Sequence, residues 1–483
     1  MNLGRMIEET ANKYPGNMAV IHEKCRMTFA ELNGAANALA HYLCSLGIGR
    51  GDKVALMLPN CPEFIISYFA AQKLGAVAVT INVMSTPYEQ RHLLGNSDAR
   101  VLIAQSVAVR RYEEIKEDLP LCRHALITAG MDTDCPFTRV LRDHPRTWEM
   151  PAIDPDDPAV MIYTSGLTGR PLGAQLTHAN LMTQAVLLEE AYNGTTADRG
   201  LAVIPFFHSF GAAANMLTAI RTGARIVLME RFTLESIFAT IERERVTFTC
   251  SVPRMFLGML FHQGGEKYDL SSLRLCITGG STMPADFIPL FREKFGAPLV
   301  EGYGLTEASP ICTITRLEQE NKPGAIGTPI GGVEARIIAD DNTDVPRGET
   351  GELIVRGKNV MKGYYKDERA TAEVIRDGWL HTGDLGRMDA DGYIFLTGRK
   401  KRMVITSGFN VYPREVEIVL EMHPAVAAAR VESKEDMMRG EIVKALIVRK
   451  PGVEADEKEI LRHCRAYLSS YKLPREVEFI SNF

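Results

Sequence analysis

Short apolar runs that alternate with helical patterns constrain the fold of this chain more than any other feature. The segment Thr28–Glu31 carries a capping-box pattern, which marks a helix start, and leucines and alanines follow it at helical spacing. A buried-strand pattern occupies residues 54–60, and a helical pattern at 64–74 ends at Gly75 and is followed by a strand pattern at 76–81. This alternation predicts an α/β fold.

The same pattern returns further along the chain. Apolar or β-branched runs end in Gly, Pro or a charged turn at residues 225–230, 246–253, 273–280 and 297–304. Open α/β sheets bind ligands where strand ends open into Gly-rich loops, so these ends are candidate ligand sites. From about Gly324, short strands with Gly and Asp turns predict a β-rich segment. Residues 415–483 predict a small α+β unit, which follows a basic linker at 399–402.

Composition excludes several classes of protein. The 483 residues are 46% hydrophobic and 24% charged, as in a globular protein of about two to four domains. A formal net charge of −5 gives no general attraction to nucleic acid or anionic membrane. None of the nine cysteines has Cys-x-x-Cys spacing, which disfavours a zinc ribbon or a disulfide scaffold. The N-terminus lacks a secretory signal pattern, and residues 64–84 read as a helix and a strand rather than a membrane span, so we expect a cytoplasmic protein.

Three stretches carry groups suited to nucleotide chemistry. Tyr163–Gly173 is rich in Ser, Thr and Gly, and the backbone N–H groups of such a loop can hold phosphate, although it is not a Walker loop. Glu301–Glu307 places an aromatic ring, a hydroxyl and a carboxylate close together, which suits base stacking and Mg²⁺ binding. Gly378–Gly386 contains Asp384, which could accept both hydroxyls of a ribose. Each stretch alone is equally compatible with an ordinary loop.

Together, in this order and at these separations, the three stretches resemble the adenylate-forming superfamily of acyl-CoA synthetases, luciferases and peptide-synthetase adenylation domains. Further segments that agree are 205–211, 278–281, 398–399 and 407–413. The resemblance covers essentially the whole chain. It implies an α/β protein with a large N-terminal domain (1–398) of two doubly wound α/β subdomains plus a β-rich subdomain. A hinge would join this to a small, mobile α+β C-terminal domain (399–483).

The resemblance also implies the reaction. Members of the superfamily activate a carboxylic acid with ATP and Mg²⁺ to an acyl-adenylate and pyrophosphate, and they usually pass the acyl group to a thiol. We therefore expect an AMP-forming acyl-CoA synthetase that uses ATP, Mg²⁺ and coenzyme A, with a carboxylic acid, expected to be a fatty acid, as substrate. No nucleic-acid partner is expected, and a homodimer is a further expectation.

Individual residues take their expected roles from the same resemblance. The loop that holds the β- and γ-phosphates matches Thr164, Ser165, Gly166, Thr168 and Gly169. The adenine-binding stretch matches Glu301, Gly302, Tyr303 and Gly304, with Tyr303 as the stacking ring. Thr306 matches an α-phosphate contact. Glu307 matches the Mg²⁺ ligand, and Thr164 is a second metal candidate. Asp384 and Arg399 match the pair that binds the ribose.

The remaining matches concern the acyl group and the thiol. His208 matches a residue that flanks the acyl carboxylate, and we count it as catalytic together with Thr306 and Glu307. The passage between nucleotide and acyl pocket matches Gly279, Gly280 and Ser281. Lys401 matches the hinge, and Gly408 matches a glycine beside which the pantetheine arm of CoA passes. An apolar acyl pocket is expected from Phe206, Phe207, Phe210 and Met283, and Arg254 is a weaker candidate for pairing with a second carboxylate.

The chain departs from the family pattern in two places. The phosphate loop normally ends in Pro-Lys-Gly, but here Leu172 stands in place of the lysine and Leu167 in place of a hydroxyl residue. The family also continues beyond a position equivalent to Phe483 into a segment whose lysine contacts the α-phosphate, so we expect a truncated C-terminal domain. Loss of such a cation typically costs ~10²–10³ in rate, and we expect weak adenylation. Arg170 as a substitute cation, a nucleotide- or acyl-binding pseudoenzyme, and a carrier-protein acceptor remain alternatives.

Overall fold

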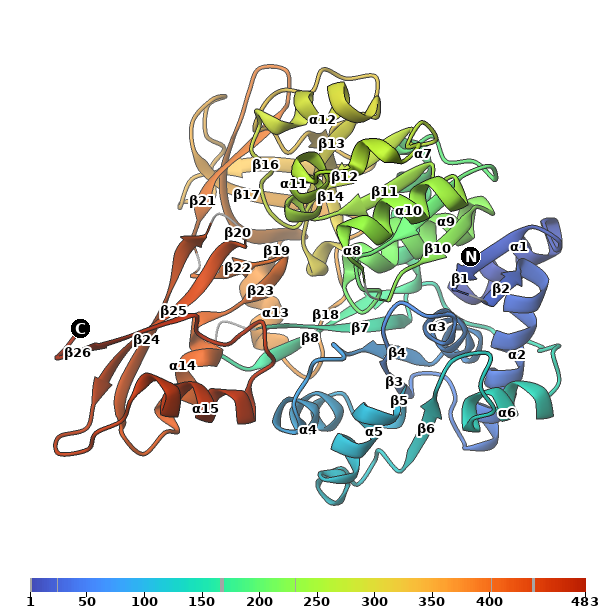
Figure 1. Ribbon diagram of the computed structural model, residues 1–483, viewed down its shortest axis with the longest axis horizontal. Coiled ribbons are helices and arrows are strands. Elements are labelled where there is room, and N and C mark those ends of the chain that lie inside the picture. The colour runs from blue at the N-terminus through green and yellow to red at the C-terminus, as the bar shows by residue number, and fades with distance from the viewer. Residues whose placement is uncertain (1, 24, 166–168, 231, 401, 437–438) are drawn as a thin grey trace.

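The computed structural model describes residues 2–23, 25–165, 169–230, 232–400, 402–436 and 439–483. Within these ranges the strands form four sheets, three in the large N-terminal part and one in the C-terminal part. Figure 1 shows the C-terminal part, in red, on one side of the molecule, with the helices α1 (Leu3–Lys13) and α2 (Phe29–Ser45), in blue, on the other. Residues 166–168 of the predicted phosphate loop and the predicted hinge residue Lys401 lie outside the described residues.

The first α/β sheet holds the predicted phosphate loop. Its strands run in the order β18-β8-β7-β4-β3-β5-β6, parallel from β7 to β6 and antiparallel at β8 and β18. The strands are β3 (Lys53–Met57), β4 (Val77–Thr80), β5 (Ala99–Gln105), β6 (His124–Thr128), β7 (Pro158–Ser165), β8 (Pro171–Thr177) and β18 (Gly363–Tyr364). The helices around it are α1 (Leu3–Lys13), α2 (Phe29–Ser45), α3 (Pro62–Leu74), α4 (Pro87–Asn96), α5 (Ser106–Glu113), α6 (Pro136–Asp143) and α7 (His178–Ala191).

The second α/β sheet contains the predicted adenine-binding stretch, which lies at the end of β13. Its order is β15-β14-β13-β12-β11-β9-β10-β1-β2, and the run from β13 to β1 is parallel. The strands are β1 (Met18–His22), β2 (Cys25–Thr28), β9 (Arg199–Ala202), β10 (Arg225–Leu228), β11 (Phe248–Ser251), β12 (Leu275–Thr278), β13 (Leu299–Gly304), β14 (Ile311–Ile314) and β15 (Thr328–Pro329). The helices of this part are α8 (Ser209–Gly211), α9 (Thr218–Thr222), α10 (Leu234–Glu244), α11 (Pro253–Phe261) and α12 (Phe287–Phe295).

The β-rich segment predicted after Gly324 forms the third sheet. Its order is β16-β17-β20-β19, and β21 pairs with β20. The elements are β16 (Val333–Ile338), β17 (Gly351–Gly357), α13 (Glu368–Val374), β19 (Ile375–Arg376), β20 (Trp379–Met388) and β21 (Ile394–Arg399). Asp384 and Arg399 are partners across the β20–β21 pair, so this sheet brings the two predicted ribose-binding residues together.

The C-terminal part has a sheet and an apolar core of its own. The sheet order is β23-β22-β25-β24, with β26 beside β25, and its core includes Val416, Leu420, Val443 and Ile460. The elements are β22 (Val404–Thr406), β23 (Phe409–Val411), α14 (Pro413–Glu421), β24 (Val426–Asp436), β25 (Gly440–Arg449), α15 (Glu457–Tyr467) and β26 (Glu476–Ile480). The predicted fold class is confirmed, whereas the boundary after residue 398, which falls at the end of β21, and the mobility of this domain remain predictions.

Candidate active site

A central cavity lies where the ends of β7 and β13 face the C-terminal part. Its lining comes from both α/β sheets, from the β-rich sheet and from the hairpin β22–β23. Most of the predicted site residues that the structure describes line it: Thr164, His208, Gly279, Gly280, Ser281, Glu301, Gly302, Tyr303, Gly304, Thr306, Glu307, Asp384, Arg399 and Gly408. The structure therefore gathers segments that lie far apart in the sequence around one space.

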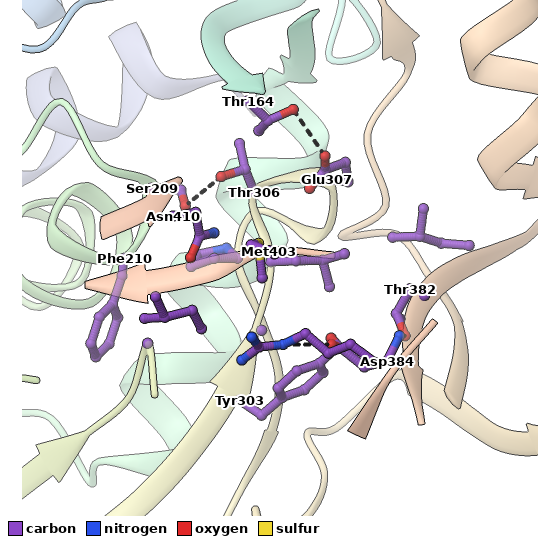
Figure 2. A pocket seen from close by; sticks show the side chains of 18 of the residues that line it. Thr164, Ser209, Phe210, Tyr303, Thr306, Glu307, Thr382, Asp384, Met403 and Asn410 are labelled. Carbon is purple, nitrogen blue, oxygen red and sulfur yellow. Dashed lines mark hydrogen bonds and ion pairs between the residues drawn. The ribbon is translucent and has the colours of Figure 1, made fainter. Parts of the chain in front are cut away.

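The carboxylate of Glu307 is held at one end of this cavity. Glu307 follows β13, and its Oε1 atom accepts a hydrogen bond of 3.1 Å from the hydroxyl of Thr164 at the end of β7 (Figure 2). The phenol of Tyr364 in β18 donates a second hydrogen bond, of 2.8 Å, to the same oxygen. The two predicted metal candidates, Thr164 and Glu307, are therefore neighbours.

Tyr303, Asp384 and Arg399 form a second group in the cavity. The Tyr303 hydroxyl donates a hydrogen bond of 2.6 Å to Oδ2 of Asp384, and Nε of Arg399 lies 3.5 Å from Oδ1 of the same carboxylate. The backbone N–H of Asp384 donates to the hydroxyl of Thr382 within β20, which restrains the backbone that carries the carboxylate. Figure 2 shows Tyr303 and Asp384 side by side, so an aromatic ring and a ribose-binding candidate belong to one subsite.

His208 stands at the start of α8 and lines the same cavity. Its Nδ1 accepts a hydrogen bond of 3.3 Å from the backbone N–H of Phe210, so the proton of the neutral ring is on Nε2. Burial lowers the pKa of His208 to about 4, and the imidazole is neutral at pH 7. The neighbouring Ser209 hydroxyl lies 3.3 Å from the hydroxyl of Thr306 (Figure 2). This part of the cavity therefore offers neutral hydrogen-bond donors, namely the imidazole of His208 and the hydroxyls of Ser209 and Thr306.

Glu301 supports the loop that contains the predicted passage residues. Its Oε1 accepts a hydrogen bond of 3.0 Å from the backbone N–H of Met283, two residues after the Gly279–Ser281 segment. Oε2 is buried and has no hydrogen-bond partner within the described ranges of the chain. Burial raises the pKa of Glu301 to about 7, which favours a protonated carboxyl group near neutral pH.

The hairpin β22–β23 closes the cavity from the C-terminal side. Gly408 has a positive φ of 86°, and a Cβ atom there would lie 2.5 Å from Cγ1 of Val252, so only glycine allows this close approach. The Arg254 guanidinium donates a hydrogen bond of 3.1 Å to the hydroxyl of Ser407. Arg254 therefore contacts the C-terminal domain, and this geometry does not support its pairing with a substrate carboxylate.

Residues around the phosphate loop line two adjoining cavities. The hairpin register pairs Thr164 with Leu172, and Leu172 lines the central cavity beside it. Gly169 and Arg170 line a second cavity, the interdomain cavity, between α4 and the C-terminal domain. This cavity shares Thr164 and Thr306 with the central one, and the role of Arg170 as a substitute cation stays a prediction. Ser165 ends β7, and the predictions for Gly166, Leu167 and Thr168 fall outside the described residues.

The apolar pocket was predicted only in part. Phe210 lines the central cavity and Phe207 the interdomain cavity. Phe206 is fully buried and packs on Phe64, and Met283 is buried in a core cluster, so neither lines one of these cavities. Sequence proximity to His208 could not distinguish the side chains that face the core from those that face the cavity.

Several lining residues were not predicted. They include Ser209, Tyr364, Thr382, Met403, Ile405, Asn410 and Tyr412. Ser209, Asn410 and Tyr412 lie inside segments that carry the family resemblance, and their polar side chains were a usable signal. Tyr364 lies in Gly-Tyr-Tyr, outside those segments, and it enters the site only through the pairing of β18 with β8.

The residues of the cavity fit a nucleotide with a divalent cation. No group of three or more His, Cys, Asp or Glu side chains in the described part of the chain could hold a metal ion by itself. Mg²⁺ is usually bound by one or two carboxylates together with substrate phosphates, and Glu307 beside the Thr164 hydroxyl fits that pattern. The site thus suits a cation that arrives with a nucleotide.

Comparison with known proteins agrees with this geometry. A family model described as AMP-binding enzyme matches residues 7–365, and one described as AMP-binding enzyme C-terminal domain matches residues 415–483. No helix in the described ranges is long and apolar enough to cross a membrane.

Named relatives point to the same chemistry. The long-chain-fatty-acid–CoA ligase of Bacillus subtilis (strain 168) is 33% identical, with 99% of this chain and 90% of the relative covered. The feruloyl-CoA synthase of Amycolatopsis sp is 36% identical, with 99% and 94% covered. A double mutant of o-succinylbenzoate CoA synthetase from Bacillus subtilis, bound with its product analogue, has a TM-score of 0.89 at 30% identity, with 99% and 95% covered. The chain therefore belongs to the AMP-binding enzyme family and is an AMP-forming acid–thiol ligase of the adenylate-forming superfamily, the group of the acyl-CoA synthetases.

Proposed function

We propose that this protein joins a carboxylic acid to coenzyme A in two steps, through an acyl-adenylate formed from ATP. The observation that carries the proposal is the central cavity, where Thr164 and Glu307 lie in one space with Tyr303, Asp384 and Gly408. The first pair suits phosphates and a cation, the second pair suits adenine and ribose, and Gly408 lies where a thiol arm would pass the backbone. One cavity thus offers a place for each reactant.

The residues of the cavity have separate tasks in the first step. Attack of a carboxylate oxygen on the α-phosphorus forms an acyl–phosphate bond and releases pyrophosphate, so negative charge grows on phosphate oxygens. The Thr306 hydroxyl can donate to the α-phosphate, and a cation held by Glu307 would neutralise charge on the leaving group. The neutral His208 can donate its Nε2–H to an oxygen of the acyl carboxylate. No side chain has to act as a nucleophile.

The second step uses the C-terminal hairpin. A thiolate of coenzyme A attacks the acyl carbon of the adenylate, forms the thioester and expels AMP. Gly408 lines the cavity, and the absence of a side chain there lets the hairpin pack directly against Val252. Asn410 and Tyr412 come from the same hairpin and the following residue, and they line the cavity next to the reacting groups. The named relatives are a CoA ligase and a CoA synthase, which supports coenzyme A as the acceptor.

The acid that we propose is an apolar one of the fatty-acid type. Phe207 and Phe210 provide apolar surface next to His208, which supports an apolar acyl group. The named relatives include a long-chain fatty acid ligase and a feruloyl-CoA synthase, so an aromatic acid is the main alternative. A cytoplasmic location and a homodimer remain predictions.

Adenylation is proposed to be slow in this chain. Leu172 lies opposite Thr164 across the β7–β8 hairpin, at the cavity wall, and it carries no charge. A cation at this point would be close to the phosphates, and removing one such stabiliser typically costs ~10²–10³ in rate.

The test is acid-dependent exchange of labelled pyrophosphate into ATP, followed by measurement of AMP release on addition of coenzyme A. A panel of saturated fatty acids of increasing length, ferulate and indoleacetate would identify the acid class. We expect exchange with at least one acid and AMP release that requires CoA. Nucleotide binding without exchange would support a pseudoenzyme, and AMP release only with a phosphopantetheinylated carrier protein would replace CoA as the acceptor.

A further inference from the structure

Tyr364 is a cavity residue that none of the roles above uses. Its phenol donates the shorter of the two hydrogen bonds that reach Oε1 of Glu307, at 2.8 Å against 3.1 Å from Thr164. Both bonds end on the same oxygen, so neither occupies Oε2. Because the donors come from β18 and β7, the carboxylate is held from two directions.

The backbone around Tyr364 is fixed to the same neighbours. The N–H of Met361 donates a hydrogen bond of 2.8 Å to the main-chain carbonyl of Glu307. Tyr364 pairs with Ala174 in β8, and its own N–H donates to the hydroxyl of Thr371 at 2.8 Å. The segment is thus tied to the main chain of Glu307 and to the strand that follows the phosphate loop.

The preceding glycine makes this approach possible. Gly363 has a φ of 143°, and a Cβ atom there would lie 2.8 Å from Cγ2 of Thr371. Any other residue would push β18 away from α13 and would shift the phenol of Tyr364 with it.

The direction of the hydrogen bond to Glu307 is also fixed. The Tyr364 O–H group is the donor, and the carboxylate oxygen of Glu307 is the acceptor. A hydrogen bond to a carboxylate is a stronger interaction than a bond between two neutral groups.

We propose that Tyr364 is a positioning residue that orients the Glu307 carboxylate toward the cation which accompanies the nucleotide. The inference rests on the proposed function, since that function supplies the metal–nucleotide complex. Tyr364 does not touch the cation itself. It restrains Oε1, so that Oε2 faces the cavity before the complex arrives. Loss of a hydrogen-bonding partner behind a metal ligand typically costs ~10–100-fold in metal affinity, and we expect that range here.

The chain offers a matched control in the next residue. Tyr365 also donates a phenolic hydrogen bond of 2.8 Å to a carboxylate, that of Asp98, and is likewise partly buried. Its partner lies outside the central cavity. Tyr364→Phe and Tyr365→Phe therefore remove the same atom and the same kind of bond, and only the first removal affects Glu307.

The experiment measures metal binding rather than turnover. Mn²⁺ is titrated by electron paramagnetic resonance into protein saturated with a non-hydrolysable ATP analogue, and binding of the analogue in EDTA is measured by calorimetry. We expect Tyr364→Phe to weaken Mn²⁺ binding by ~10–100-fold with metal-free nucleotide binding unchanged, and Tyr365→Phe to leave both within about twofold. Tyr364→Gln, whose amide can donate, should recover part of the loss and provides a second variant if Tyr364→Phe is unstable.

Two results would overturn the proposal in distinguishable ways. Wild-type affinity for Mn²⁺ in Tyr364→Phe, or equal losses in Tyr364→Phe and Tyr365→Phe, would refute the positioning role and leave the proposed function intact. A wild-type protein that binds no Mn²⁺ with the nucleotide analogue would contradict the proposed function and the positioning role with it.

Discussion

Replacement of Lys472 by methionine should loosen the contact between the C-terminal domain and the N-terminal part. The Lys472 ammonium lies 2.7 Å from Oε1 of Glu89 in α4 and 2.5 Å from Oε1 of Glu415 in α14, and no more than 8% of any of these side chains is exposed. The hydroxyl of Ser469 also donates to Glu89. Removal of one partner from a buried ionic group typically costs ~3–5 kcal/mol, because the remaining charge loses its compensation.

The size of the effect should depend on pH. Without the ammonium, one carboxylate must stay buried as an unpaired charge or take up a proton. Protonation costs about 1.4 kcal/mol for each pH unit above a pKa near 4.3, hence ~3.7 kcal/mol at pH 7 and ~1 kcal/mol at pH 5. At pH 7 this corresponds to a factor of about 500 in the opening equilibrium.

The wild-type contact should change little over the same pH range. Burial opposes the charge on both groups, but Lys472 lowers the pKa of Glu89, and Glu415 and Glu89 raise that of Lys472 well above its usual value. The stabilisation that Glu89 contributes to the contact is present above the pKa that Glu89 has in the unfolded chain. It is lost as the pH falls through the pKa of Glu89 in the folded protein. The stabilisation that Lys472 contributes is present below the pKa that Lys472 has in the unfolded chain. It is lost as the pH rises through the pKa of Lys472 in the folded protein. Between pH 5 and pH 8 both are present.

Hydrogen exchange of the segments 86–96 and 467–472 measures this contact at pH 5, 6, 7 and 8. We expect exchange to be faster in Lys472→Met by about 500-fold at pH 7 and by roughly 5-fold at pH 5. Lys444→Met is the matched control, because Lys444 lies 2.7 Å from Glu478 and 3.3 Å from Glu476 but these carboxylates are 53% and 36% exposed. Exposed pairs contribute ~0–1 kcal/mol. Equal effects of the two substitutions, or a Lys472→Met effect that is the same at pH 5 and pH 8, would refute the reasoning.

Three further predictions concern the cavity. Leu172→Lys should raise the rate of ATP–pyrophosphate exchange by ~10²–10³-fold, while Leu172→Met should not; an unchanged rate in Leu172→Lys would show that charge at this position does not limit adenylation. Asp384→Asn should raise the KM for ATP by about tenfold in steady-state kinetics with little change in the KM for the acid, because Asp384 belongs to the nucleotide subsite; equal changes would contradict that assignment. Burial raises the pKa of Glu301 from 4.5 to about 7. The contribution of Glu301 to the free energy of unfolding is therefore greatest below pH 4.5 and falls by about 3 kcal/mol as the pH rises to 7. Glu301→Gln should remove this part of the pH dependence of thermal unfolding, and an unaltered pH profile would exclude the raised pKa.

Local signals were sufficient to predict much of the fold. The helix expected at 64–74 is α3, which begins at Pro62, and Gly75 ends it with a φ of 69°. The Thr28–Glu31 pattern forms a capping box at the start of α2. Both features depend on residues within one helical turn of the helix end, so the sequence pattern contains all that is needed.

The cavity was harder to predict because its geometry depends on distant pairings. Tyr364 reaches Glu307 only through the two-residue strand β18, which has no recognisable pattern of its own. Phe206 and Phe207 are adjacent in the sequence, yet one packs in the core and the other lines a cavity. Motifs identified which segments meet, whereas packing decided which side chain of each segment faces the space between them.

The shared lining of the central cavity links ligand binding to the position of the C-terminal domain. Because Glu307 and Tyr303 come from one side and Gly408 and Tyr412 from the other, a ligand that touches both sides binds more tightly when the domains are in contact. By thermodynamic reciprocity the same ligand strengthens that contact, and a tenfold preference corresponds to about 1.4 kcal/mol. A reactant that touches both sides would therefore stabilise the contact between the domains, and its departure would weaken that contact.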